Sequence, residues 1–301
     1  HSWLAACATI APGHPAMSYL AIDIGGTNFT MALFEGGRMV ERLSRATDRE
    51  GGKDWMLERI EETGRSWSGF SAVGVGFGGP VDFPTQQVVL STHVGGWQGF
   101  DLPGWLKEQF AVPVLMDNDA NVGALGEGLH GAGRGQRPLL YMTLSTGIGG
   151  GILTEHGLLR GADSYAGELG HITIRPDGPD CLCGSNGCFE RMCSGLWLER
   201  DHGRTAKELM DEPEFVQQYV VDLARGLKAA LMLLNPARIV IGGGIPKAGE
   251  KLFAPLRHEL RRQMTAWSRA RLDVVPAELG NDSVLWGAFE LAREAAGGTK
   301  P

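Results

Sequence analysis

The order strand, glycine-rich turn, strand occurs twice in this chain and limits the folds open to it. Residues 19–24 form a buried-strand pattern that ends in the turn 25–28, and residues 29–34 form a second strand directly afterwards. The pattern recurs at residues 139–144, where the strand ends in the turn 145–151. Because each unit is expected to fold as a β-hairpin, the repetition predicts a fold built from two similar lobes.

Helical and strand-like segments alternate along the rest of the chain. Apolar residues at helical spacing or helix-forming composition predict helices at 53–65, 102–110, 214–234 and 283–296. Short apolar runs predict further strands at 71–77, 112–116, 238–241 and 272–275. The alternation indicates the α/β class, and the antiparallel hairpins require mixed sheets. The length of 301 residues is sufficient for two domains.

Three glycine-rich turns follow predicted strands, and together they indicate a nucleotide site. Glycine amides can approach phosphate oxygens closely, a threonine adds a hydroxyl, and Asp23 can hold Mg²⁺ directly or through water. A single turn of this kind is more simply explained as a tight connection between strands. Three of them favour nucleotide binding by Asp23, Gly25, Gly26, Thr27 and Asn28, by Thr146, Gly147 and Gly149, and by Gly242, Gly243 and Gly244.

A short loop carries four soft metal ligands: His171, Cys181, Cys183 and Cys188. One imidazole and three thiolates suit tetrahedral zinc, and four protein ligands leave no position for a water molecule. We therefore predict a structural Zn²⁺ site. The alternatives are a disulfide loop or ordinary buried thiols, but Cys181 and Cys183 are too close in sequence to pair easily. The two cysteines outside the loop are expected to be small apolar residues.

Acidic residues flank the predicted metal loop on both sides. Glu168 lies three residues before His171, and Glu190 lies two residues after Cys188. A bound metal ion would hold this loop rigid, with a carboxylate at each end. We therefore expect the loop to form one wall of a polar binding pocket.

A second acidic segment, residues 117–121, follows the predicted strand 112–116. Phosphoryl transfer to an alcohol needs a carboxylate near the hydroxyl, together with neutralised and positioned phosphates. Asp119 is the candidate base, and Asn118 is a candidate for recognition of a hydroxyl group. Helix capping is the alternative for this segment and explains one of Asp117, Asn118 and Asp119 without requiring all three. Glu127 is expected to have a helical or structural role.

At these motifs the sequence resembles the ROK family of repressors, open reading frames and sugar kinases. The resemblance runs from about Ser18 to the last helix, with the glutamate–histidine pair and the cysteine loop as its most specific part. The segments that carry it are residues 23–28, 74–82, 118–121, 146–151, 167–171, 181–190 and 242–244. It implies a two-lobed fold like the actin-like ATPases and ribonuclease H, with a nucleotide cleft between the lobes. It also implies an ATP- and Mg²⁺-dependent hexose kinase that acts at the 6-hydroxyl. Asp119 would be the base, and Asn118, Glu168, His171 and Glu190 would contact sugar hydroxyls.

We expect a disordered N-terminal extension at residues 1–17. The small lobe is expected at residues 18–117 plus 286–301, and the large lobe, with the zinc loop, at residues 118–285. Two positions depart from the family pattern. This chain has Gly78-Gly79 where the family often has Pro-Gly, and Gly79 is a candidate substrate-binding residue. It also has His93 where the family often has Asn. Both positions lie near the expected sugar pocket. The resemblance therefore defines the type of reaction better than the identity of the sugar.

Glucose is the default substrate, and N-acetylmannosamine or N-acetylglucosamine is the alternative. ATP is the expected donor, with polyphosphate left open. A sugar sensor without catalysis is the rival class, but it needs neither Asp119 nor Asp23. The net charge of −7 argues against a nucleic-acid partner, and no stretch is apolar enough to cross a bilayer. We expect a cytoplasmic protein, and the family resemblance implies a homodimer or homotetramer.

Overall fold

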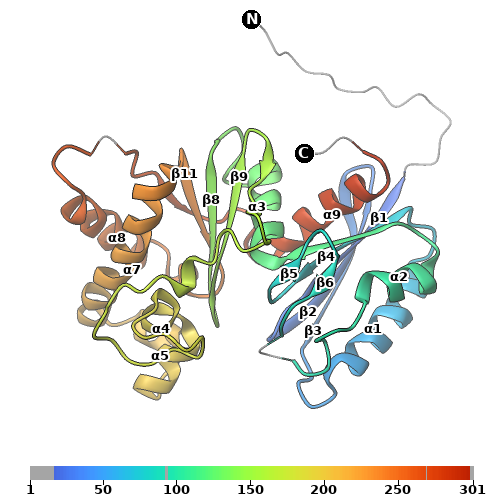
Figure 1. Ribbon diagram of the computed structural model, residues 1–301, viewed down its shortest axis with the longest axis horizontal. Coiled ribbons are helices and arrows are strands. Elements are labelled where there is room, and N and C mark those ends of the chain that lie inside the picture. The colour runs from blue at the N-terminus through green and yellow to red at the C-terminus, as the bar shows by residue number, and fades with distance from the viewer. Residues whose placement is uncertain (1–16, 92–93, 269, 299–301) are drawn as a thin grey trace, which may run out of the picture.

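The computed structural model describes residues 17–91, 94–268 and 270–298. Figure 1 shows two halves side by side, each built on one five-stranded sheet. The extension 1–16, Cys7 and His93 lie outside the described residues. Among the described residues, no helix is both long and apolar enough to span a membrane.

The first sheet has the strand order β3-β2-β1-β4-β7. Strands β1, β2 and β3 are antiparallel neighbours, whereas β1, β4 and β7 run parallel, so the sheet is mixed as predicted. The strands are β1 (Ser18–Ile24), β2 (Asn28–Glu35), β3 (Arg38–Ala46), β4 (Ala72–Phe77) and β7 (Val114–Asn118). Helices α1 (Gly52–Ser66) and α2 (Leu102–Phe110) pack on it, and a small hairpin, β5 (Val81–Asp82) and β6 (Gln87–Val88), follows β4.

The second sheet repeats this plan with the order β10-β9-β8-β11-β12. Its strands are β8 (Leu139–Leu144), β9 (Ile148–Thr154), β10 (Gly157–Leu158), β11 (Arg238–Gly242) and β12 (Val274–Pro276). A hydrophobic core joins it to α7 (Pro213–Leu234) and α8 (Glu250–Gln263). The remaining short elements are η1 (Leu169–His171), α4 (Phe189–Cys193), α5 (Gly195–His202), α6 (Ala206–Leu209), η2 (Ile245–Ala248) and η3 (Gly280–Asp282).

Two helices, α3 (Asp119–His130) and α9 (Ser283–Ala295), lie between the sheets (Figure 1). A third core contains side chains from both helices and from both sheets. The two helices cross closely because glycines face backbone at the contact. A Cβ on Gly287 would lie 1.7 Å from the Val122 carbonyl oxygen, and one on Gly126 would lie 2.0 Å from the Ser283 carbonyl oxygen. Larger residues would push the sheets apart.

Glu127 of α3 is fully buried and bonds the segment that leads into α9. Its carboxylate accepts hydrogen bonds from the amides of Glu278 at 3.1 Å and Leu279 at 2.9 Å, and from the Ser283 hydroxyl at 2.7 Å. It also accepts one from the Ala132 amide at 2.8 Å. The structural role expected for Glu127 is therefore confirmed.

Most predicted elements are present with small shifts of their ends. Helix α2 and strand β8 match their predicted bounds, but β7 extends through Asn118, so Asp117 and Asn118 belong to a strand. Strand β12 begins at Val274, two residues later than predicted. Helix α8 was not predicted; it contains Pro255, which lowers the helical signal in isolated sequence, and its apolar face packs in the second-sheet core.

We predict that Glu127→Ala lowers the free energy of unfolding by about 3 kcal/mol or more, because several buried donors lose their acceptor. Urea unfolding followed by circular dichroism would measure this. The exposed Glu108→Ala is the matched control and should change stability by less than about 0.5 kcal/mol. Equal stabilities of the two variants would contradict the role assigned to Glu127.

Candidate active site

The first residue of α3, Asp119, follows β7 without a loop, so the end of the first sheet fixes its position. Asn118 is the residue that caps the helix. Its side-chain oxygen accepts a hydrogen bond from the Ala120 amide at 3.0 Å, and its side-chain nitrogen donates one to the Gly79 carbonyl at 3.0 Å. Asn118 thus joins the helix start to the segment after β4.

Asp117, one residue earlier, is buried and makes three hydrogen bonds. One carboxylate oxygen accepts from the Asn118 amide at 2.7 Å and from the Asn121 side chain at 3.0 Å. The other accepts from the Arg160 Nε at 2.7 Å. Arg160 belongs to no motif that the sequence indicates. A buried aspartate predicts a cationic partner, but nothing local in the sequence says which one.

The Asp119 side chain is half-buried at the junction of the two halves. Burial, and then the nearby Glu168 carboxylate, raise its pKa to about 6, against hydrogen bonds from Ala120 and Asn118 that lower it. A Cβ on Gly78 would lie 3.7 Å from its Oδ2. Gly78 therefore places no side chain of its own against this carboxylate.

Asp23 lies on β1 close enough to Asp119 for the two charges to interact. Burial raises the pKa of Asp23 to about 8, and the carboxylates of Asp119 and Asp282 add to this, while Arg42 opposes it. Two half-buried carboxylates that repel one another favour a cation beside them. Oxygen ligands of this kind fit Mg²⁺.

The two glycine-rich turns of the repeated hairpins meet. The Thr27 hydroxyl, after β1, lies 3.3 Å from the Thr146 hydroxyl, after β8. The first turn is further held by the segment after β3, since the Thr47 hydroxyl donates to the Gly25 carbonyl at 2.8 Å and Arg49 Nε to the Gly26 carbonyl at 3.2 Å. Within the turn, the Gly25 amide donates to the Asn28 carbonyl at 3.0 Å.

The third predicted turn, Gly242 to Gly244, lies beside the second. Gly243 has φ of +103°, and a Cβ there would lie 2.4 Å from the Leu144 carbonyl oxygen, so glycine is required. The position of a Cβ on Gly244 is 3.8 Å from the Ser145 hydroxyl. The structure thus brings all three predicted nucleotide-binding turns to one place.

The two predicted acids of the sugar wall also converge there. Glu190 Oε2 accepts a hydrogen bond at 2.8 Å from the amide of Ile148, which follows Gly147 of the second turn. The predicted turn 145–151 is shorter than expected, because β9 begins at Ile148 and includes Gly149. Burial, and then Glu190, raise the pKa of Glu168, against the influence of His171. The Glu168 carboxylate is thus close enough to Asp119 and to His171 of the metal loop for the charges to interact.

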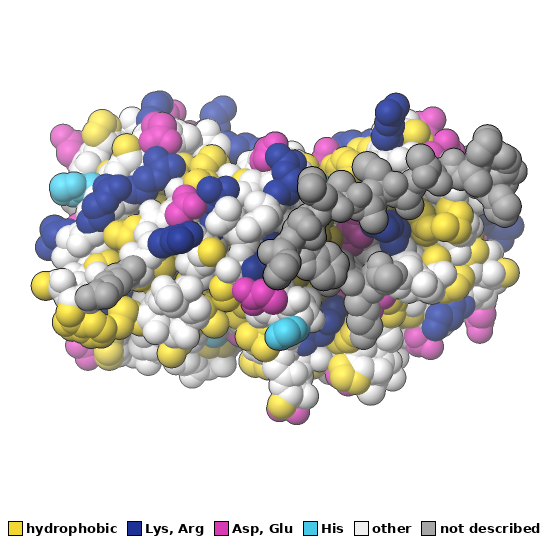
Figure 2. All heavy atoms as spheres, turned by 90° about the horizontal axis from the view of Figure 1, so that it is seen from above, with side chains coloured by type: hydrophobic (Ala, Val, Ile, Leu, Met, Phe, Trp, Pro, Cys, Tyr) yellow, Lys and Arg dark blue, Asp and Glu magenta, His cyan; other side chains and the backbone are white. Residues whose placement is uncertain are grey.

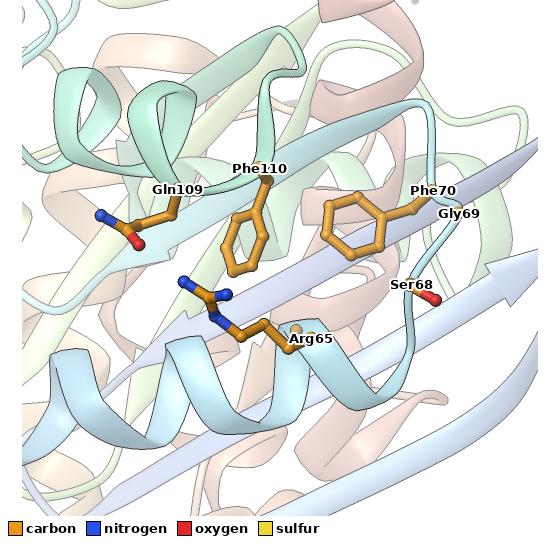
Figure 3. Close-up of a pocket in the computed structure, with 7 residues that line it drawn as sticks. Arg65, Ser68, Gly69, Phe70, Gln109 and Phe110 are labelled. Atoms are coloured by element: carbon orange, nitrogen blue, oxygen red, sulfur yellow. The ribbon is translucent and has the colours of Figure 1, made fainter.

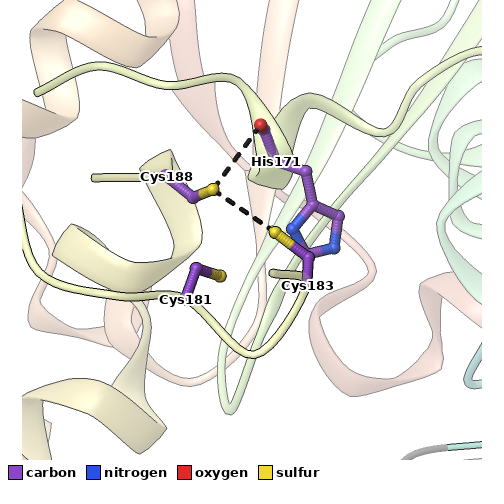
Figure 4. Close-up of side chains that lie close together, drawn as sticks. All are labelled: His171, Cys181, Cys183 and Cys188. Atoms are coloured by element: carbon purple, nitrogen blue, oxygen red, sulfur yellow. Dashed lines mark hydrogen bonds between the residues drawn. The ribbon is translucent and has the colours of Figure 1, made fainter. Parts of the chain in front are cut away.

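Figure 4 shows the four predicted metal ligands around one point. One ligand atom from each of His171, Cys181, Cys183 and Cys188 lies within 4.8 Å of the others. The Cys183 and Cys188 sulfurs are 3.6 Å apart, so these thiols are not joined as a disulfide. Cys193, which was expected to be apolar, is fully buried outside this group. Three sulfurs and one imidazole at this spacing fit a tetrahedral ion.

A surface cavity of about 300 Å³ lies elsewhere, where α1 and α2 end (Figure 3). Phe70 and Phe110 line it, and its charged side chain, Arg65, pairs with Glu61 at 2.7 Å. It contains neither a carboxylate nor any residue of the site described above. We therefore assign it no part in the chemistry.

The model of the ROK family matches residues 19–295 of the chain. The chain belongs to the ROK family. This ROK protein is 34% identical to a glucokinase of Thermotoga maritima, over 94% of this chain and 100% of that protein.

Solved structures of ROK proteins have the same fold. A ROK hexokinase of Thermus thermophilus superimposes with a TM-score of 0.81 at 32% identity, covering 92% of this chain and 98% of the other. A ROK glucokinase of Streptomyces griseus, in complex with glucose and AMPPNP, gives 0.81 at 29% identity, covering 92% and 99%. These likenesses confirm the predicted two-lobed, actin-like ATPase fold.

We predict that Asp119→Asn stabilises the Mg²⁺-free protein at pH 8. The unfolded carboxyl releases its proton near pH 3.8 and the folded one near 6, so the folded state holds more protons between these values. Wild-type stability therefore falls as pH rises through this window and stays lower above it. Asn lacks the charge, so the variant should melt about 2–6 °C higher at pH 8, with a smaller gain at pH 5. Calorimetry at both pH values would measure this, and a less stable variant at pH 8 would contradict it.

Proposed function

We propose that this ROK protein is an ATP-dependent hexose kinase that phosphorylates the 6-hydroxyl of glucose or a related hexose. The observation that carries the proposal is the convergence of Asp119, Glu168 and the three glycine-rich turns at one junction. Its support from comparison is the likeness to a glucokinase over most of both chains and to a structure that holds glucose and AMPPNP.

Asp119 is proposed as the base of the reaction. Its carboxylate takes the proton of the sugar 6-hydroxyl as that oxygen forms a bond to the γ-phosphorus of ATP, while the bond to the β-phosphate oxygen breaks and ADP leaves. A pKa of about 6 suits this role, because the group is mostly ionised at pH 7 and is a stronger base than an exposed aspartate.

The remaining residues position the two substrates. We propose that Asn118, Glu168, His171 and Glu190 contact sugar hydroxyls, as the resemblance to the family implies, and that Gly79 lies beside the sugar. The turns that begin at Gly25, Thr146 and Gly242 would hold the nucleotide. Mg²⁺, held by Asp23 directly or through water, would neutralise charge on the ATP phosphates when bound.

The metal group is proposed to be a structural Zn²⁺ site formed by His171, Cys181, Cys183 and Cys188. The donor set and its compact arrangement support zinc over harder cations. Cys188 precedes α4, whose second residue is Glu190, and η1 ends at His171. The ion would therefore fix the backbone on which both proposed sugar-binding glutamates are carried.

We further propose a cytoplasmic homodimer or homotetramer. Free thiols at Cys181, Cys183, Cys188 and Cys193 suit a reducing compartment. Figure 2 shows basic and acidic side chains interspersed on one face of the second half, and the chain as a whole carries a net charge of −7. Nucleotide and sugar are the partners that the site supports.

ADP release from ATP, measured against glucose, N-acetylmannosamine and N-acetylglucosamine, tests the proposed activity. We expect glucose to be phosphorylated, and Asp119→Asn to lower turnover by about 10²–10⁴-fold while the protein still binds sugar. Glu108→Gln, a substitution of an exposed carboxylate away from the site, should keep full activity. Sugar binding without any ADP release by the wild type would favour a sensor instead.

Cys183→Ser should lose the metal. We expect zinc at one ion per chain in the wild type and much less in the variant, with a lower melting temperature and a higher KM for the sugar. Elemental analysis and thermal melting measure these changes. Cys193→Ala removes a thiol outside the group and should retain the zinc. A Cys183→Ser protein with one zinc and normal melting would overturn the ligand assignment.

A further inference from the structure

An ion pair crosses between the two sheets beside the proposed base. Asp117 is at the end of β7 in the first sheet, whereas Arg160 follows β10 of the second sheet. Arg160 Nε donates to Asp117 Oδ2 at 2.7 Å, and the two side chains are 23% and 2% exposed. The aspartate is thus desolvated, and Arg160 supplies its charge partner.

The same arginine holds the hairpin that follows β4. Its guanidinium carbon lies 3.6 Å from the centre of the Phe83 ring, in the turn between β5 and β6. Ser164, four residues after Arg160, accepts a hydrogen bond from the Phe83 amide at 3.1 Å. The hairpin is therefore fastened to the segment 160–166 at two points.

That segment leads directly to Glu168. The Ala166 amide donates to the Arg160 carbonyl at 3.0 Å, which closes the segment into a compact loop. At its end, a Cβ on Gly167 would lie 2.2 Å from the Gly150 carbonyl oxygen, so the backbone before Glu168 is pressed against β9. A shift of Arg160 would therefore be transmitted to Glu168 through a short, constrained path.

Three segments with proposed sugar-binding residues meet at Arg160: Gly79 with the hairpin after it, Asn118 with Asp119, and Glu168. Asp117 fixes the second of these, since it accepts from the Asn118 amide at 2.7 Å.

We propose that Arg160 is a positioning residue that locks these three segments into the geometry that binds the hexose. The inference rests on the proposed kinase function. Arg160 acts through Asp117 and Phe83 and does not itself touch the reacting atoms.

Arg160→Gln is the test. We expect the KM for the hexose to rise and kcat/KM for it to fall by about 10–100-fold, because small displacements of positioning groups are costly. The KM for ATP should change less than about twofold, since the three nucleotide turns do not contact Arg160. Arg160→Lys keeps the charge but loses the planar stacking, so its loss should be intermediate. Arg238→Gln, which breaks a 2.8 Å ion pair with Asp273 away from the site, is the matched control and should keep the wild-type sugar KM.

The double variant Asp117→Asn/Arg160→Gln separates positioning from stability. Arg160→Gln alone leaves the buried Asp117 charge without its partner, and the added Asp117→Asn removes that charge. The melting temperature of the double variant should therefore recover toward the wild type, while its sugar KM stays high. Recovery of both would show that the pair is only structural and would overturn the proposal. An unchanged sugar KM in Arg160→Gln would overturn it as well.

Amide hydrogen exchange provides a readout that does not depend on catalysis. In Arg160→Gln, exchange should accelerate at residues 81–88 and 160–168 and stay unchanged in α7. If the wild type phosphorylates no hexose, the proposed function fails, and this exchange pattern still tests the lock. Unchanged exchange in both segments would reject the lock itself.

Discussion

The close crossing of α3 and α9 between the two sheets is the constraint on which the rest of the structure depends. Backbone meets backbone at Gly126 and Gly287, so the sheets can share one apolar core around the two helices. Because α3 begins at Asp119, the same packing that joins the halves also points this residue at their junction. Glu127 bonds the other end of α3 to the start of α9, which fixes the direction of the helix.

The electrostatics of the junction follow from this packing. Asp23 comes from β1, Asp119 from the start of α3 between the sheets and Glu168 from the segment after β10, so the three carboxylates are brought together only by the folded arrangement. Their mutual repulsion is a cost that the apolar core around α3 and α9 must offset. Three carboxylates at one place favour a cation and a substrate rich in hydroxyl groups. The binding properties of the site therefore depend on the packing that brings the carboxylates together.

Features coded by residues close in sequence could be predicted, and those made by distant packing could not. The cysteine loop is local, so the four ligands grouped by the structure are the four that spacing indicated. The hairpin turns could also be predicted from local sequence, but their contact through Thr27 and Thr146 depends on how the lobes meet. By contrast, the pairing of Arg160 with Asp117 spans 43 residues and two sheets, and no pattern in either segment specifies it. Helix α8 was missed because Pro255 masks a helix that tertiary packing supports.

A crystal structure with Zn²⁺, glucose and AMPPNP would show whether Asp119 faces the sugar. We expect the sugar to lie between Asp119 and Glu168, with its 6-oxygen at about 2.6–3.2 Å from the Asp119 carboxylate and facing the γ-phosphate. We also expect one ion on the four loop ligands. Glucose bound at another surface, or an Asp119 carboxylate directed away from the sugar, would contradict the role proposed for Asp119.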